Sequence, residues 1–73
     1  MTELQFTGTV RKSPLGAWTI EADGGTVYEL AQPVDRRLLQ TGLRVKLTGK
    51  PRPDLMSMHM VGTILEVVHF EAI

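Results

Sequence analysis

Polar and apolar residues alternate along two stretches of the chain, which is the pattern of a half-buried β-strand. Every second residue of 4–10 is apolar or glycine, and the same holds for residues 43–49. We therefore predict strands over about 4–12 and 43–50. Gly8 stands where the pattern requires a buried side chain, and this indicates either a bulge or a sharp coil of the first strand.

The segments 17–22 and 26–31 are expected to pair as a hairpin, joined by a loop that contains two adjacent glycines. A three-residue loop with Gly25 in the left-handed conformation sets Ile20 opposite Tyr28, so that apolar residues face apolar ones. A two-residue loop would set Ile20 opposite a glutamate, and we therefore prefer the first register. It places Trp18, Ile20, Tyr28 and Leu30 in the core and leaves Thr19, Glu21, Val27 and Glu29 outside.

The second half of the chain begins with a predicted helix and ends with a predicted strand. Residues 32–42 suit a helix of about two turns, because Pro33 fits a first helical position and Gly42 fits a C-terminal cap. Residues 63–72 are apolar enough for a central strand. The pattern slips within this strand, which a bulge near Val67 and Val68 would explain.

Glycine and proline divide the chain every eight to twelve residues, which favours short strands in a barrel or sandwich. The 73 residues are enough for one small domain spanning 1–73. We predict an all-β fold, with three strands, one short helix and two further strands in that order. This is the order of a five-stranded OB-fold barrel, and an SH3-like barrel is the alternative.

A resemblance to known proteins supports this fold. Residues 39–49, which read Leu-Gln-Thr-Gly-Leu-Arg-Val-Lys-Leu-Thr-Gly, look like the helix exit and fourth strand of small bacterial OB-fold proteins. Together with residues 6–10 and 54–67, they make the chain resemble a group of small uncharacterised bacterial OB-fold-like single-domain proteins over nearly its full length. The resemblance implies an OB-like barrel and implies no particular activity.

Charge and composition exclude several classes of protein. Eight basic residues balance eight acidic ones, so no net charge attracts nucleic acid or an anionic membrane. The chain has no cysteine, which excludes disulfides, thiolate metal sites and cysteine nucleophiles. The first residues have neither the basic region nor the apolar region of a secretion signal. We therefore expect a cytoplasmic protein that does not enter the membrane.

Basic residues are nevertheless concentrated in one part of the chain. Residues 36–52 contain six basic and no acidic residues, whereas residues 1–35 contain two basic and five acidic ones. In an OB barrel the first and fourth strands are neighbours, which suggests weak single-stranded nucleic-acid binding as one hypothesis. The residues that would carry it are Arg11, Arg44, Lys46, Lys50 and Arg52. The alternative is a solvated basic face that is partly paired with nearby glutamates, because exposed strand faces are normally polar. The predicted outer face of the second and third strands opposes it, because that face carries two glutamates and no aromatic residue.

A methionine-rich arm precedes the last predicted strand. Thioethers suit Cu(I), so Met56, Met58 and Met60 suggest copper binding as a further hypothesis. Small copper carriers with an OB barrel place such a pair in the middle of the barrel sequence, which argues against this reading. Leu55 and the three methionines also form an apolar arm that a second copy of the chain could cover, giving a homodimer.

No catalytic arrangement emerges from the sequence. Asp54, Ser57 and His59 are the residue types of a hydrolase triad, but successive residues on one face of a strand lie nearly 7 Å apart, beyond hydrogen-bond reach. We therefore expect a non-catalytic binding or accessory module without cofactor or metal. The sequence does not identify its ligand, and single-stranded nucleic acid and another protein are the candidates.

Overall fold

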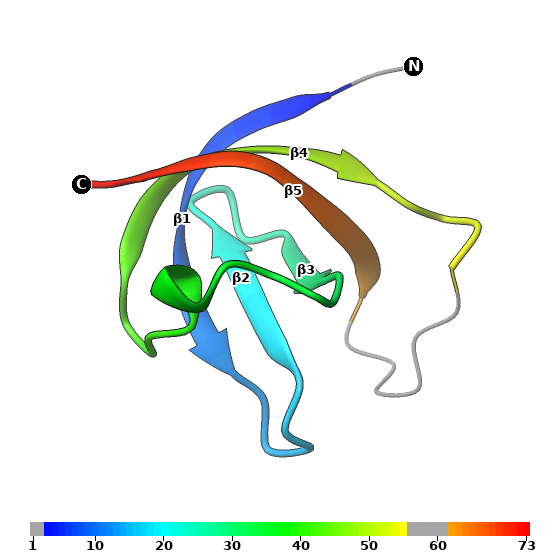
Figure 1. Cartoon of the computed structure of the whole chain (residues 1–73), viewed down its shortest axis with the longest axis horizontal. Coiled ribbons are helices and arrows are strands. Elements are labelled where there is room, and N and C mark those ends of the chain that lie inside the picture. Colours follow the sequence, from blue (N-terminus) through cyan, green and yellow to red (C-terminus); the bar gives the residue numbers. More distant parts are fainter. Residues whose placement is uncertain (1–2, 56–61) are drawn as a thin grey trace.

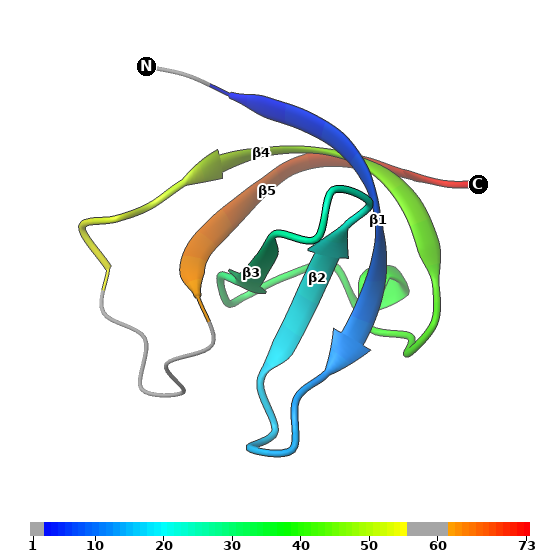
Figure 2. The ribbon, with the colours of Figure 1, turned by 180° about the vertical axis from the view of Figure 1, so that it is seen from behind.

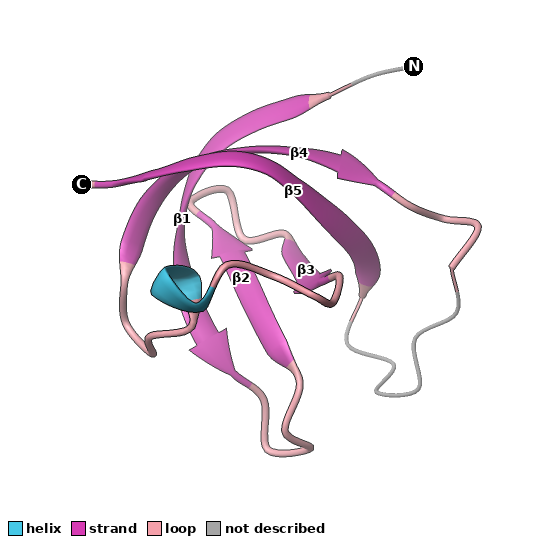
Figure 3. Cartoon of the chain, in the orientation of Figure 1, coloured by secondary structure: helices cyan, strands magenta, loops and turns pink. Residues whose placement is uncertain are grey.

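The computed structural model describes residues 3–55 and 62–73, in which the regular elements are five strands and one 3₁₀ turn (Figures 1 and 3). Each strand lies within two residues of its predicted position. The elements are β1 (Leu4–Lys12), β2 (Trp18–Ala22), β3 (Val27–Leu30), the 3₁₀ turn η1 (Arg36–Leu38), β4 (Arg44–Pro51) and β5 (Thr63–Ala72).

The five strands close into a barrel in the order β1-β2-β3-β5-β4, and β4 returns to pair with β1. All neighbours are antiparallel except β3 and β5, which run parallel. Figure 2 shows the barrel from behind, with β1 crossing its whole height. This is the strand order of an OB-fold-like barrel, so the predicted fold class is confirmed and the SH3-like alternative is not the fold that forms.

A single continuous strand, β1, joins the two halves of the barrel. It pairs with β4 through residues 4–9 and with β2 through residues 8–12, without a register shift in either ladder. Gly8 pairs on both sides, and a Cβ added there would lie 2.7 Å from the carbonyl oxygen of Glu21. The glycine therefore permits a sharp coil and a close approach of two strands, and the bulge considered as an alternative does not occur.

The hairpin of β2 and β3 has the predicted register. Ile20 lies opposite Tyr28, and the amide of Gly25 donates to the carbonyl of Ala22 at 2.8 Å. Gly25 has a φ of 100°, which is the left-handed conformation that a bulge-closed three-residue loop requires. Loop length and the sorting of polar from apolar residues were therefore sufficient to fix this pairing.

The core fills the barrel with aliphatic side chains. Its fully buried members are Val10, Ile20, Leu30, Leu38, Val45, Leu47 and Leu65. Trp18 and Tyr28 are half-buried and pack against this cluster, and the Tyr28 ring stacks on Phe6 with centroids 5.4 Å apart. The predicted inward direction of both rings is confirmed, although both residues stay partly exposed.

Thr19 differs from its prediction. It belongs to the outer face of β2, yet only 5% of its surface is exposed. Arg11 on β1 and Glu29 on β3 lie directly opposite it on either side, and the Thr19 hydroxyl donates to the Arg11 carbonyl at 3.1 Å. On a central strand, long neighbouring side chains cover a small one, and alternation alone does not reveal this.

The predicted two-turn helix over 32–42 is a single 3₁₀ turn, η1. Asp35 begins it, because its carboxylate accepts the amide hydrogen of Arg37 at 2.9 Å. Pro33 therefore lies before the turn, in a bend of the connection that follows β3. Gly42 lies in a separate turn, where its amide donates to the Val10 carbonyl at 2.7 Å. The turn still positions Leu38, which enters the core completely.

The bulge predicted in the last strand is present. Gly49 of β4 pairs with Val67 and Thr48 pairs with His69, which leaves Val68 without an opposite residue. Val68 is accordingly 48% exposed. The bulge lets β5 place both Val67 and Phe70 against the barrel interior.

Candidate binding cleft

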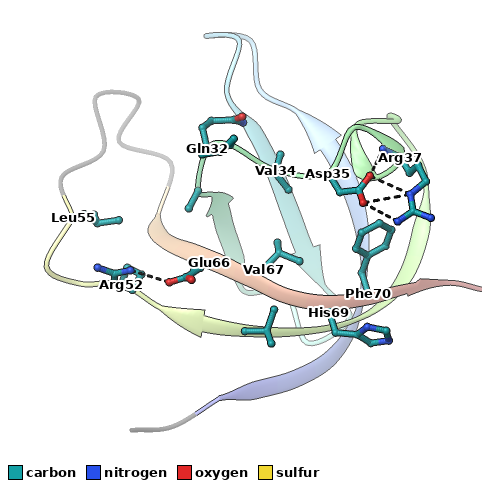
Figure 4. Close-up of a pocket in the computed structure, with 13 residues that line it drawn as sticks. Gln32, Val34, Asp35, Arg37, Arg52, Leu55, Glu66, Val67, His69 and Phe70 are labelled. Atoms are coloured by element: carbon teal, nitrogen blue, oxygen red, sulfur yellow. Dashed lines mark hydrogen bonds and ion pairs between the residues drawn. The ribbon is translucent and has the colours of Figure 1, made fainter.

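A cleft of about 650 Å³ lies between β5 and the connection that leads from β3 to η1 (Figure 4). Residues 31–35 and Arg37 form one wall, and residues 66–70 form the other. The volume lies within the range of small-molecule sites. The cleft exists because the connection separates from β5 after one last hydrogen bond, from the Ala31 amide to the Leu65 carbonyl at 2.9 Å.

The middle of the cleft is apolar. Val34 points into it from the connection, and Val67 points toward Val34 from β5, as Figure 4 shows. Phe70 lies two paired positions further along β5. All three side chains are half-buried and pack against the barrel core. The floor of the cleft is therefore continuous with the core, which gives it a fixed shape.

An ion pair between Asp35 and Arg37 closes one end of the cleft. The pair is bidentate, with Arg37 Nη2 2.8 Å from Asp35 Oδ2 and Nε 3.1 Å from Oδ1. The guanidinium lies over the Phe70 ring, with 5.7 Å between Cζ and the ring centroid. Hydrogen bonds from the Arg37 side chain and then from its backbone amide lower the pKa of Asp35 from 3.8 to about 2. Asp35 is therefore an ionised carboxylate near neutral pH.

A second group of charges lies at the other end. Arg52 donates to Asp54 Oδ2 at 3.0 Å and to Glu66 Oε1 at 2.8 Å, which joins the end of β4 to β5. Both hydrogen bonds raise the pKa of Arg52, and the bond with Asp54 has the larger effect. The same bond lowers the pKa of Asp54. Leu55 lies beside this group and is 41% exposed. Both ends of the cleft thus carry paired charges of opposite sign.

The five cations predicted to bind nucleic acid do not form one free positive strip. Four of them lie within 4.0 Å of a carboxylate, in the pairs Arg11–Glu21, Arg44–Asp23, Lys50–Glu3 and Arg52 with Asp54 and Glu66. Lys46 has no ion pair within the described part of the chain. It lines a small depression of about 140 Å³ beside Thr48 and His69. Arg52 alone of the five lines the larger cleft, and the proposed role of the whole set stays a prediction.

The outer face of β2 and β3, which single strands often occupy on OB folds, is acidic in this protein. Glu21 accepts a hydrogen bond from Arg11 at 3.0 Å, and Thr19 is covered. The neighbouring Trp18 ring lies under the Lys12 ammonium group, 5.5 Å from its centroid. The aromatic residues of these strands pack against the core instead of forming a stacking platform on this face.

The methionine arm lies outside the described residues, and so do Met56, Met58, Met60, Ser57 and His59. Copper binding and self-association therefore stay predictions. Two residues named in these hypotheses are described: Asp54 accepts hydrogen bonds from Arg52 at 3.0 and 3.1 Å, and Leu55 is 41% exposed. Among residues 3–55 and 62–73, no three His, Asp or Glu side chains gather closely enough to hold a metal ion. None of these residues belongs to a helix of the length and hydrophobicity needed to cross a membrane.

Sequence reasoning did not identify this cleft, although it identified several of its parts. The apolar run of β5 and its slip at Val68 were visible, but they were read only as features of a strand. The cleft depends on the position at which residues 31–35 separate from β5, and the pattern of polar and apolar residues does not predict that position. Comparison of the chain with protein-family models, with curated proteins and with solved structures finds no match. The geometry of the cleft therefore carries the functional argument.

Proposed function

We propose that the protein is a non-catalytic binding module that holds its ligand in the cleft between residues 31–37 and β5. The observation that carries this proposal is the apolar floor of Val34, Val67 and Phe70 between two groups of paired charges. The exposed lining of the cleft is more polar than apolar, and its apolar residues gather at the floor, where a ligand site usually offers hydrophobic contact. A cytoplasmic location stays part of the proposal.

The ionisation of the cleft favours binding over catalysis. General acid–base groups work best when their pKa lies near the operating pH. The pKa values of Asp35 and Asp54 are both lowered, away from neutral pH, because arginine side chains donate hydrogen bonds to both carboxylates. These acids are suited to orient a ligand or an arginine, and they are unsuited to exchange protons at neutral pH.

Single-stranded nucleic-acid binding remains the alternative proposal, but the arrangement of charges gives it less support. A phosphate that approached Arg44 would compete with Asp23, which accepts from the guanidinium at 2.7 Å and 3.2 Å. Competition of this kind applies to four of the five candidate cations. Affinity from phosphate contacts would therefore be low and would fall further as salt is added.

A fragment screen by two-dimensional NMR tests the proposal. Small amphipathic fragments added to ¹⁵N-labelled protein are expected to shift the amide signals of residues lining the cleft. Arg37→Gln should change the affinity of those fragments, and Arg36→Gln is the matched control, since Arg36 is adjacent and does not line the cleft. Shifts spread evenly over the barrel, or an equal effect of both variants, would reject the cleft as the ligand site.

A further inference from the structure

The two parallel strands that border the cleft differ greatly in length. β3 has four residues and β5 has ten. Their ladder covers only Thr63 to Leu65 of β5, and the Ala31 amide adds one hydrogen bond at its end. From residue 66 onward β5 pairs with β4 on one side, and no described residue pairs with its other side.

The hydrogen-bonding pattern shows which backbone groups lie on that open side. In an antiparallel ladder, the N–H and C=O groups of alternate residues point toward the partner strand. Arg52 donates to the Ile64 carbonyl at 2.7 Å and Ile73 donates to the Arg44 carbonyl at 3.0 Å, which fixes the alternation at both ends. Allowing for the bulge at Val68, the backbone groups of Val67 and Phe70 point away from β4, into the cleft.

Backbone groups of this kind are strong donors and acceptors, and an extended chain matches their spacing. The cleft of about 650 Å³ lies between residues 31–37 and β5, and about five residues of an added strand would span residues 66–70 at the usual rise of about 3.3 Å per residue. The Val67 and Phe70 side chains face the interior, so residues opposite them would project toward Val34 on the same face.

We infer that the cleft binds an extended peptide segment of a partner protein, which adds to β5 as an extra strand. Every second residue of the peptide is aliphatic and enters the apolar floor, and the residues between are polar and uncharged. The charges of the cleft disfavour an acidic segment, because both arginines are already paired and the carboxylates of Asp35, Asp54 and Glu66 outnumber them by one. This inference rests on the proposed function and names the class of ligand.

A blocked hexapeptide of alternating valine and threonine, acetylated and amidated, is the probe. In the free protein the amide hydrogens of Val67 and Phe70 should exchange rapidly, and in the complex they should be protected at least tenfold. The amides of Glu66 and Glu71, which point toward β4, are the internal control and should be protected in both states. Absence of peptide binding, or binding without protection at Val67 and Phe70, overturns the inference.

Two N-methylated peptides sharpen the test. One carries methyl groups on the valine nitrogens and the other on the threonine nitrogens, so that only one series removes the N–H groups that face β5. One of the two should lose at least tenfold in affinity while the other binds nearly as the parent does. Equal binding by both means that the backbone is not recognised, and strand addition is then wrong.

Variants of the protein separate the remaining outcomes. Val34→Ser should weaken peptide binding roughly fivefold, whereas Val27→Ser, a half-buried valine outside the cleft, should leave it unchanged. Protection of Val67 and Phe70 that rises with protein concentration in the absence of peptide would identify a second copy as the occupant and overturn the inference. If the cleft binds fragments but not the peptide, the proposed binding module stands and the peptide inference fails.

Discussion

Substitution of Gly8 by alanine tests whether the close approach of β1 and β2 holds the barrel together. The added Cβ would lie 2.7 Å from the Glu21 carbonyl oxygen and 3.0 Å from Ile20 Cγ1. Comfortable contacts lie near 3.5–4.0 Å, so the contact with the Glu21 oxygen must lengthen by about 0.8–1.3 Å. Overpacking of this kind costs about 1–3 kcal/mol. In urea, with a slope of about 1 kcal/mol per molar for so short a chain, the midpoint should fall by about 1–3 M.

Two other glycines serve as matched controls for that measurement. Nothing lies within 4 Å of a Cβ built at Gly24, and its backbone is not left-handed, so Gly24→Ala should be neutral or stabilising by about 0.4–1 kcal/mol. A Cβ at Gly25 also meets nothing, but its φ of 100° should cost about 1–2 kcal/mol. If Gly8→Ala unfolds at the same urea concentration as Gly24→Ala, the close approach does not constrain the fold and the reasoning is refuted.

Three further predictions concern the core, the cleft and the charged surface. Leu38→Ala should destabilise the protein by about 2–5 kcal/mol in the same urea experiment, because Leu38 is fully buried, whereas Leu15→Ala at a 71% exposed position should change little. The carboxyl carbon of Asp35 should titrate by NMR with a midpoint near pH 2. The contribution of this carboxylate to stability should be complete above about pH 3.8 and disappear as the pH falls through about 2. An unshifted midpoint would contradict the ion pair, and Arg37→Gln should return the pKa of Asp35 toward 3.8. A labelled single-stranded oligonucleotide should bind no more tightly than about 10⁻⁴ M at physiological salt by fluorescence anisotropy, and micromolar binding would restore the nucleic-acid alternative.

The sequence predicted local pairing well, because local pairing depends on features that a sequence displays. The register of β2 and β3 followed from the loop length, and the bulge at Val68 followed from a slip in the alternation. The helix over 32–42 was predicted too long, because proline and glycine signals fit a turn as well as a helix, and the carboxylate of Asp35 decided between them. The burial of Thr19 depends on the strands beside it, and no single-strand pattern contains that information.

The basic residues pair with acids for a topological reason. Basic residues cluster in the segment that contains β4, which suggested a positive face. In the barrel, however, β4 lies between β1 and β5, and acids from other parts of the chain reach its cations. Arg44 meets Asp23 from the β2–β3 turn, twenty-one residues away. Uneven charge along a chain therefore does not give uneven charge on its surface when the strand order interleaves the segments.

The unequal lengths of β3 and β5 explain why a closed barrel can still offer a strand edge. Closure normally removes exposed edges, which otherwise invite aggregation. Here β5 is much longer than β3, so closure is complete only over residues 63–65, and the rest of β5 borders the cleft. The wall formed by residues 31–37 restricts what can approach that edge, and the charged pairs at both ends restrict it further. An edge that is recessed in this way hinders the pairing of whole sheets but can still admit one extended chain. The difference in length between β3 and β5, which leaves this edge open, therefore also favours a single peptide over another sheet.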